Sequence, residues 1–167
     1  CRTVRLGDIC KFVSKSQGKL RRGNGWGKYT FFNGTNKLRF IDTPDFFKEA
    51  STLVWEYDGN LMVGYCNTFS CTPTVLVIQS NLIDIKFIYH YLRANMQRIR
   101  TLYDTVNEKI SLQDIISELL IDCPSVESII SSIKYCDNND MLVKESKREI
   151  EANENMLYMV LCNSIQD

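Results

Sequence analysis

Pro124 divides the chain into two parts with different hydrophobic patterns. Before it, short runs of β-branched and aromatic residues alternate with turns that contain glycine and asparagine, which is the pattern of short strands joined by tight turns. After it, apolar residues recur at helical spacing. The chain therefore has to combine a β-rich globule with a helical extension, and we predict one domain over residues 1–124 and a helical spacer over residues 125–167.

The stretch 105–124, TVNEKISLQDIISELLIDCP, joins the two parts. Ser111 lies three positions before Asp114, which is the spacing of a capping box and predicts the start of a short helix. The apolar run 119–121 then predicts a buried strand that stops at Pro124. No catalytic motif lies in this stretch, so the reason for the order helix, strand, proline and helix must be architectural.

The β-rich part predicts a mixed, curved sheet with peripheral helices, an α+β fold. A strand or helical turn is expected over 4–13 and a mobile glycine-rich loop over 14–27. Thr43-Pro44 followed by DFFKEA predicts a single capped helical turn, and an amphipathic helix with a basic outer side is expected over 84–103. The remaining runs predict strands at 28–32, 37–41, 52–57, 61–66 and 72–79. Asp58-Gly59-Asn60 is a strong hairpin signal between two of them.

Two helices are expected after Pro124. Ser125 caps the first helix, the sequence DNND at 137–140 breaks it, and a second helix runs from Met141 to Ile165. The second helix carries a narrow apolar seam that needs another helix to bury it, as in a coiled coil. The residues of this seam are Val143, Ile150, Leu157, Val160 and Leu161.

The charge of the chain is split between the two parts. Residues 1–110 carry 16 lysines and arginines against 9 aspartates and glutamates, whereas residues 111–167 carry 4 against 11. A globule with a net charge of +7 followed by a tail of −7 predicts that the globule meets an anion. Nucleic acid is the commonest such anion, although charge by itself does not identify it.

Composition and motifs exclude several classes of protein. With 44% hydrophobic and 24% charged residues, and no apolar run of about 20 residues, the chain is expected to be a soluble cytoplasmic protein without a membrane partner. The seven cysteines predict reduced, mostly buried thiols rather than a disulfide framework or a zinc site. His90, the only histidine, is expected to be a packed side chain, and no phosphate-binding glycine motif is present. We therefore expect no catalysis, cofactor or metal.

The order of the motifs resembles one half of the specificity subunit of type I restriction–modification systems. VRLGDIC at 4–10 is similar to the Leu-Gly-Asp opening of that family, and GKYTFFNGT at 27–35 to its Tyr-Pro-hydrophobic-Tyr segment, with Thr30 in place of the proline. The stretch 57–78 is similar to the family's Gly-Ser and Gly-x-hydrophobic strands, and KFIYHYLRA at 86–94 to its Tyr-hydrophobic-Tyr-x-Leu helix.

The same family joins its recognition domain to its spacer by a helix of the form Ile-Ser-x-x-Asp-hydrophobic and a strand that ends Ile-Pro-hydrophobic-Pro. KISLQDI and LLIDCPSVES follow this order here. The departures are Cys123 and Ser125 on either side of a single proline, Ser128 in place of the usual glutamine, Asn60 in place of serine, and Cys71-Thr72 in place of a small pair.

The resemblance implies a non-catalytic domain that reads one half of a split double-stranded DNA target. It also implies a methyltransferase subunit, and possibly a restriction subunit, as partners. The second spacer helix would come from a second copy of the chain or from a second half of the same chain. The residues expected to contact DNA are Lys15, Lys19, Arg21, Arg22, Asn24, Lys28, Asn33, Thr35, Asn36, Lys37, Tyr65 and Asn67.

Alternatives remain at this point. Because the chain begins with Cys1 rather than methionine, it is expected to be a fragment. It could be the recognition domain of a single-chain restriction endonuclease–methyltransferase. It could also be a related domain that serves as a protein- or RNA-interaction module. Arg93, Arg98 and Arg100 could follow phosphates along the basic helix or form a solvated face. The residues of the turn, Asn33, Thr35, Asn36 and Lys37, could equally serve only to form that turn.

Overall fold

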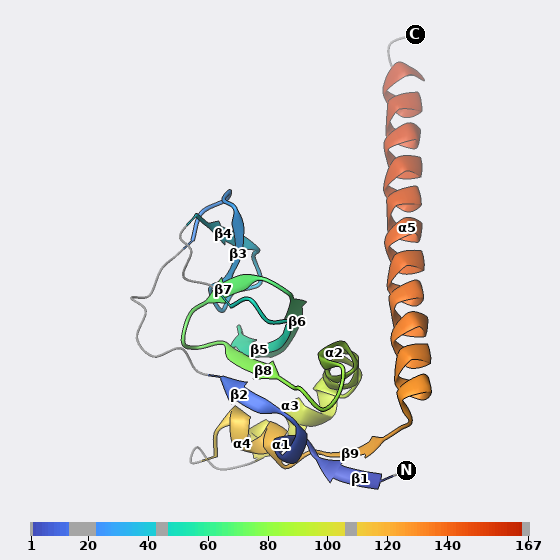
Figure 1. The fold of residues 1–167 in the computed structure, drawn as a ribbon. Coiled ribbons are helices and arrows are strands. Elements are labelled where there is room, and N and C mark those ends of the chain that lie inside the picture. Colours follow the sequence, from blue (N-terminus) through green and yellow to red (C-terminus); the bar gives the residue numbers. More distant parts are fainter. Residues whose placement is uncertain (1, 14–22, 43–46, 106–109, 165–167) are drawn as a thin grey trace. The chain divides into compact units, whose positions relative to one another are not determined.

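The computed structural model describes residues 2–13, 23–42, 47–105 and 110–164 (Figure 1). They form two compact units, Cys1–Ile129 and Ile130–Asp167. The first unit contains all the strands and the short helices, and the second consists of most of one long helix. Among the described helices, none is long and apolar enough to cross a membrane.

The first unit is a mixed α+β domain, as predicted. Its helices are α1 (Leu6–Ile9), α2 (Ile85–Ala94), α3 (Met96–Thr105) and α4 (Leu112–Ser117). Its strands are β1 (Arg2–Arg5), β2 (Lys11–Val13), β3 (Tyr29–Phe32), β4 (Arg39–Ile41), β5 (Ser51–Tyr57), β6 (Asn60–Cys66), β7 (Phe69–Cys71), β8 (Leu76–Gln79) and β9 (Leu120–Cys123). The described strands form open sheets in the orders β2-β8-β5-β6, β4-β3-β7 and β1-β9, and only β3 and β7 run parallel.

Strand β5 lies at the centre of the first unit and is buried on both faces. Successive side chains of a strand point to opposite faces, so Leu53 and Trp55 share one face while Thr52 and Val54 share the other. Leu53 and Trp55 belong to the apolar core that also contains Phe69 of β7. On the opposite face the Thr52 hydroxyl donates a hydrogen bond of 3.0 Å to the carbonyl oxygen at the start of α2.

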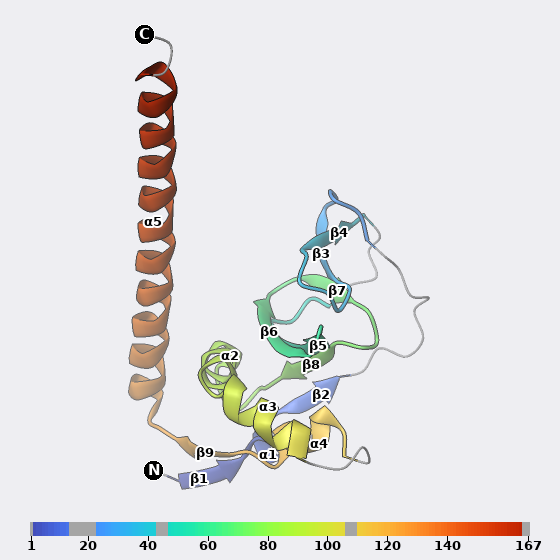
Figure 2. The ribbon, with the colours of Figure 1, turned by 180° about the vertical axis from the view of Figure 1, so that it is seen from behind.

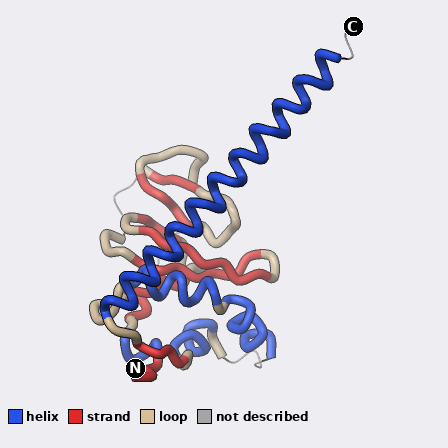
Figure 3. Tube along the Cα trace, turned by 90° about the vertical axis from the view of Figure 1, so that its right-hand side faces the viewer, coloured by secondary structure: helices blue, strands red, loops and turns tan. Residues whose placement is uncertain are grey.

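The first unit consequently has three layers. The sheet β4-β3-β7 covers one face of the sheet β2-β8-β5-β6, and α2 and α3 cover the other, an order that is the same from the front, from behind and from the side (Figures 1, 2 and 3). The β5–β6 hairpin is the one predicted from Asp58 and Gly59. Both residues have positive φ, 50° and 73°, as a two-residue turn of this kind requires.

The junction before the long helix also forms as predicted. The Ser111 hydroxyl accepts a hydrogen bond from the Asp114 amide at 3.2 Å, and the Asp114 carboxylate accepts one from the Ser111 amide at 3.2 Å, so the capping box of α4 is complete. The Ser111 hydroxyl also donates to the Asp114 carboxylate at 2.6 Å, and this bond together with the one from the Ser111 amide lowers the pKa of the Asp114 carboxyl. Strand β9 then follows α4, and Ile121 is buried.

What the sequence did not reveal is the partner of β9. It pairs antiparallel with β1, the first described strand of the chain, with Val4 opposite Ile121. The Leu6 amide donates to the Leu119 carbonyl at 2.9 Å, and the Thr3 hydroxyl donates to the Asp122 carboxylate at 2.6 Å. This pairing of two segments far apart in sequence ties both ends of the globule together directly before the spacer helix.

Two predicted elements of the first unit were wrong in extent. The single helix expected over 84–103 is two helices, because Asn95 ends α2: its amide donates to the carbonyls of Tyr91 and Leu92. The strand expected over 72–79 begins only at Leu76, since residue 73 is a proline and the Val75 amide turns back to the Thr72 carbonyl at 3.1 Å.

The predicted break in the spacer was also wrong. Residues 137–140 are helical, and one helix, α5 (Val126–Ser164), replaces the two that were expected. Asparagine and aspartate each disfavour a helix by only about 0.7 kcal/mol relative to alanine, so the four residues together cost about 3 kcal/mol, which is less than the roughly 4 kcal/mol of a new helix nucleus. The start of α5 is as predicted, because the Ser125 hydroxyl accepts a hydrogen bond from the Ser128 amide at 3.3 Å.

The cysteines whose side chains are described carry free thiols, but they are less buried than predicted. Cys10 is buried, and burial raises the pKa of its thiol to about 11. The other four, at positions 66, 71, 123 and 136, are half-buried. No cluster of three or more histidine, cysteine, aspartate or glutamate side chains suited to a metal occurs among the described residues.

Candidate nucleic-acid interface

The turn between β3 and β4 is built by the polar residues that the sequence singled out. The Asn33 carboxamide oxygen accepts hydrogen bonds from the Thr35 hydroxyl at 2.7 Å and the Thr35 amide at 3.2 Å. The Thr35 hydroxyl in turn accepts from the Lys37 amide at 3.2 Å. These bonds give Asn33 and Thr35 a clear role in shaping the turn, whereas the side chains of Asn36 and Lys37 are exposed.

The same turn is fixed to the core of the domain. The Trp55 indole N–H donates to the Thr35 carbonyl oxygen at 3.1 Å, so a core side chain of β5 holds the turn from below. Gly34, with φ of 78°, passes close to Thr74, whose hydroxyl would lie 3.0 Å from a Cβ at that position. The exposed groups at positions 36 and 37 are therefore presented on a rigid support, which favours a role in recognition.

The segment before β3 crosses the outer edge of the same sheet. Asn24 pairs with Phe40 of β4 through two backbone hydrogen bonds of 2.8 and 3.0 Å. The Lys28 amide donates to the Asp42 carboxylate at 2.9 Å, and the Lys28 side chain is exposed with its Nζ 5.4 Å from the centre of the Tyr29 ring. Within the loop expected over 14–27, Asn24 is thus bonded to β4, while the other described residues, 23 and 25–27, belong to no helix or strand.

Four of the predicted DNA contacts cannot be placed. Lys15, Lys19, Arg21 and Arg22 lie outside the described residues. Their role in binding stays a prediction from the sequence. The described neighbours at positions 24, 28, 36 and 37 gather around the β3–β4 sheet, which brings widely spaced members of the predicted set to one side of the domain.

Tyr65 and Asn67 belong to a different surface. The Tyr65 hydroxyl donates to the Asn67 carboxamide oxygen at 3.0 Å, and the Tyr65 ring centre lies 5.9 Å from that of Tyr89 on α2. Lys86 Nζ lies 5.7 Å from the Tyr65 ring centre. Since Tyr65 pairs with Thr52 on the helix-covered face of the sheet, the four-stranded sheet separates this cluster from the β3–β4 turn.

The basic side of α2 and α3 is engaged within the molecule. Arg100 forms ion pairs with Asp104 at 2.9 Å and with Glu56 of β5 at 3.7 Å, so it attaches α3 to the sheet. The Arg93 guanidinium lies 5.9 Å from the Tyr89 ring centre. His90 is half-buried with its ring centre 4.9 Å from that of Tyr89, as expected for a packed side chain.

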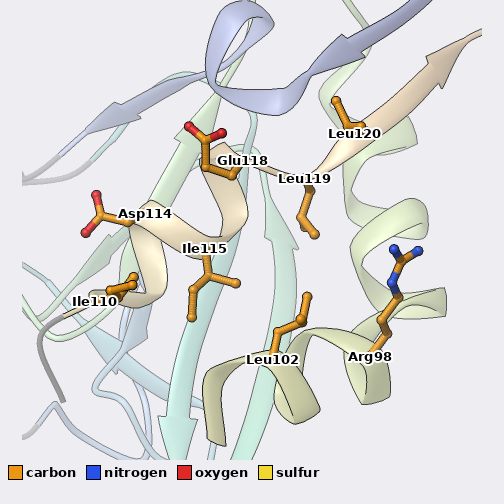
Figure 4. Close-up of a pocket in the computed structure, with 8 residues that line it drawn as sticks. All are labelled: Arg98, Leu102, Ile110, Asp114, Ile115, Glu118, Leu119 and Leu120. Atoms are coloured by element: carbon orange, nitrogen blue, oxygen red, sulfur yellow. The ribbon is translucent and has the colours of Figure 1, made fainter. Parts of the chain in front are cut away.

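An apolar cavity of about 530 Å³ lies between α3, α4 and the start of β9 (Figure 4). Arg98 reaches its rim from α3, Asp114 comes from α4, and Glu118 is the residue that follows α4. Glu118 is paired with Arg5 at 3.4 Å, and Asp114 completes the helix cap described above. The remaining lining is apolar: Leu102, Ile110, Ile115, Leu119 and Leu120.

Helix α5 carries exposed apolar side chains along its length. Val143 and Ile150 of the predicted seam are 55% and 57% exposed. The side chains of Leu157, Val160 and Leu161 lie outside the described part of the structure. Further exposed apolar residues of α5 are Val126, Ile130, Tyr135, Met141, Leu142 and Met156. A helix with this much exposed apolar surface offers a packing face to another helix.

No protein-family model and no curated protein matches the chain. Several solved structures do match the chain. A chain from the structural work on complex assembly and conformational transition of the type I restriction–modification system matches at 17% identity and a TM-score of 0.63, over 95% of this chain and 43% of that one. The S subunit from M. genitalium matches at 17% identity and a TM-score of 0.69, over 90% and 42%.

The HsdS subunit from Thermoanaerobacter tengcongensis also matches, at 15% identity and a TM-score of 0.58, over 88% of this chain and 39% of that one. The architecture is thus that of an α+β domain followed by one long helix. More particularly, the chain has the fold of one half of a type I S subunit, which confirms the resemblance in fold predicted from its motifs. It spans less than half the length of each of these chains.

Proposed function

We propose that this chain is a DNA-specificity element of a type I restriction–modification system, and that it is not itself catalytic. The fold carries the proposal: nearly the whole chain, globule and helix together, matches S subunits in element order and topology. Nothing in the described structure favours a fused enzyme or an RNA-interaction module over this role. A DNA-binding role also places the protein inside the cell.

The charge distribution supports double-stranded DNA as the ligand of the globule. The +7 charge of residues 1–110 suits a polyanion, and the β3–β4 side of the domain presents exposed Lys28 and Lys37 beside exposed Asn24 and Asn36. Lysine binds phosphate, while asparagine can form two hydrogen bonds with the major-groove edge of adenine. We place the target-reading surface on this side of the domain.

The exposed apolar side chains of α5 favour protein partners in addition to DNA. Its exposed apolar face would be covered by another spacer helix, supplied by a second copy of the chain or by a second half, and a methyltransferase subunit would assemble on the resulting coiled coil. A restriction subunit would join through that complex. Two domains related by a two-fold axis would then read a split target with inverted symmetry.

Binding to duplex DNA is the direct test. Six cations from the predicted set, at positions 15, 19, 21, 22, 28 and 37, would neutralise six phosphates. The logarithm of the binding constant should then fall with the logarithm of salt concentration with a slope of about −5. The probe is a duplex pool of randomised sequence, offered to the chain alone and together with its modification subunit, and the bound fraction is sequenced.

An enriched, split sequence motif together with a steep salt dependence is the expected outcome. Failure to retain duplex DNA at low salt, both alone and with the modification subunit, would refute the proposal. Retention without any sequence enrichment would also refute it, because a specificity element must discriminate between sequences.

A further inference from the structure

Trp26 is the most conspicuous side chain that the fold does not use. It is 73% exposed, whereas Trp55, the other tryptophan of the chain, is 7% exposed in the core. Tryptophan is highly buried on average, and a large aromatic side chain left in water contributes no burial to the stability of the fold. Leu38, which immediately precedes β4, is 60% exposed.

The backbone around Trp26 is held in place. On one side Asn24 is paired with Phe40 by the two hydrogen bonds described above. On the other side Gly27 crosses β4 so closely that a Cβ there would lie 2.9 Å from the Ile41 amide nitrogen, and Lys28 is bonded to Asp42. The indole of Trp26 therefore extends from a segment whose backbone is held against the edge of β4. Binding a partner to it costs less conformational entropy than binding to a flexible loop would.

The surroundings of Trp26 have the chemistry of a nucleic-acid contact. Lys28 is exposed two positions along the chain from Trp26, Lys37 is exposed at the β3–β4 turn, and Asp42 accepts the hydrogen bond from the Lys28 amide. Apolar side chains that contact bases, flanked by cations that contact phosphates, are the combination that DNA-deforming proteins use. An aromatic ring also contributes by stacking on any base, whatever the sequence.

From this geometry, and resting on the proposed function, we infer that Trp26 is an apolar wedge that stacks on bases of the bound duplex. Lys28 and Lys37 contact the flanking phosphates and hold the wedge in register. The indole would act at a flexible base step, where partial unstacking costs least, so it contributes to target choice through the deformability of the DNA.

Affinity and fluorescence test the inference on the full chain, with the randomised duplex pool or its enriched sequence as the probe. Trp26→Ala should weaken binding about tenfold or more, the loss expected for one stacked base, and leave the salt slope unchanged because no phosphate contact is lost. Leu82→Ala is the matched control, since Leu82 is 75% exposed in the loop before α2 and should bind as the wild type does.

Fluorescence supplies a readout that a purely structural role would not change. Stacking on a base should quench the wild-type emission, and Trp26→Phe should abolish this quenching while keeping most of the affinity, because buried Trp55 is then the remaining fluorophore. Wild-type affinity in Trp26→Ala, or full quenching in Trp26→Phe, would overturn the wedge and leave the proposed function standing. A wild-type chain that ignores duplex DNA would overturn both.

Discussion

Replacing Gly27 by alanine tests whether the loop that carries Trp26 is as rigid as the structure indicates. A Cβ at position 27 would lie 2.9 Å from the Ile41 amide nitrogen, 3.0 Å from Phe40 Cβ and 3.1 Å from the Ile41 carbonyl carbon. Real Cβ atoms are rarely found at such distances from backbone, and the φ of 154° is one that side-chain-bearing residues rarely adopt. Either the new methyl group or β4 has to move.

The strand cannot yield easily. Phe40 is bonded on its outer side to Asn24 at 2.8 and 3.0 Å, and Ile41 pairs with Tyr29 of β3 on the inner side. Overpacking of this kind costs about 1–3 kcal/mol, and an unfavourable φ costs about 1–3 kcal/mol more. The loop can relieve the clash by detaching from Phe40, which sacrifices two hydrogen bonds with a net value of about 1–3 kcal/mol together.

The expected loss in the free energy of unfolding is therefore about 1–3 kcal/mol, since detachment of the loop sets the upper limit. For a domain of this size that corresponds to a melting temperature lower by roughly 5–10 °C. Gly25→Ala is the matched control: its Cβ would meet no atom within 4 Å, and its φ is not positive. It should change stability by less than about 0.5 kcal/mol.

Urea unfolding, followed by the fluorescence change as Trp55 becomes exposed, measures the difference between the two variants. Hydrogen exchange at the amides of Asn24 and Phe40 distinguishes the two routes, because detachment would speed exchange at both amides, whereas a strained loop that stays attached would keep them protected. Equal stability of Gly25→Ala and Gly27→Ala, with unchanged exchange at these amides, would refute the close crossing of β4.

Two further predictions concern the basic loop, which is predicted from the sequence to contact DNA, and the α5 helix. Replacing Arg21 and Arg22 together by alanine should weaken duplex binding and reduce the salt slope by about 2, without lowering the melting temperature; a double variant that melts much earlier would assign these arginines a structural role. Replacing Ile150 and Leu157 together by glutamate places charges in the predicted seam and should convert a dimer into monomers with an intact globule. Sedimentation of the wild-type chain and the variant compares the two, and a wild-type monomer at high concentration would contradict self-pairing through α5.

Local patterns determined much of the fold. The Asp58-Gly59 turn, the capping box of Ser111 and Asp114 and the cap at Ser125 were all predicted from neighbouring residues, because each depends on interactions within a few positions of the chain. The same locality explains why the order of short motifs was enough to predict the fold of an S-subunit half.

The ends of helices were predicted less well where the residues have only weak preferences for helix or turn. Residues 137–140 favour a turn in isolation, yet a helix already propagating through them continues, because interrupting it would require a second nucleation. Asn95 has the opposite effect. It ends α2 through hydrogen bonds to the preceding turn, within a segment whose apolar period continues across it.

The sequence by itself determined the α+β class, the charge split and the change to a helical spacer after Pro124, since composition and periodicity are properties of the chain. Only the tertiary structure decided that β9 pairs with β1, and that Tyr65 lies on the opposite side of a sheet from the β3–β4 turn. It alone also showed that Trp26 is left in solvent on a fixed support. The pairing of strands and the exposure of side chains depend on contacts between residues far apart along the chain. A local sequence pattern does not show which distant segment will cover a given side chain.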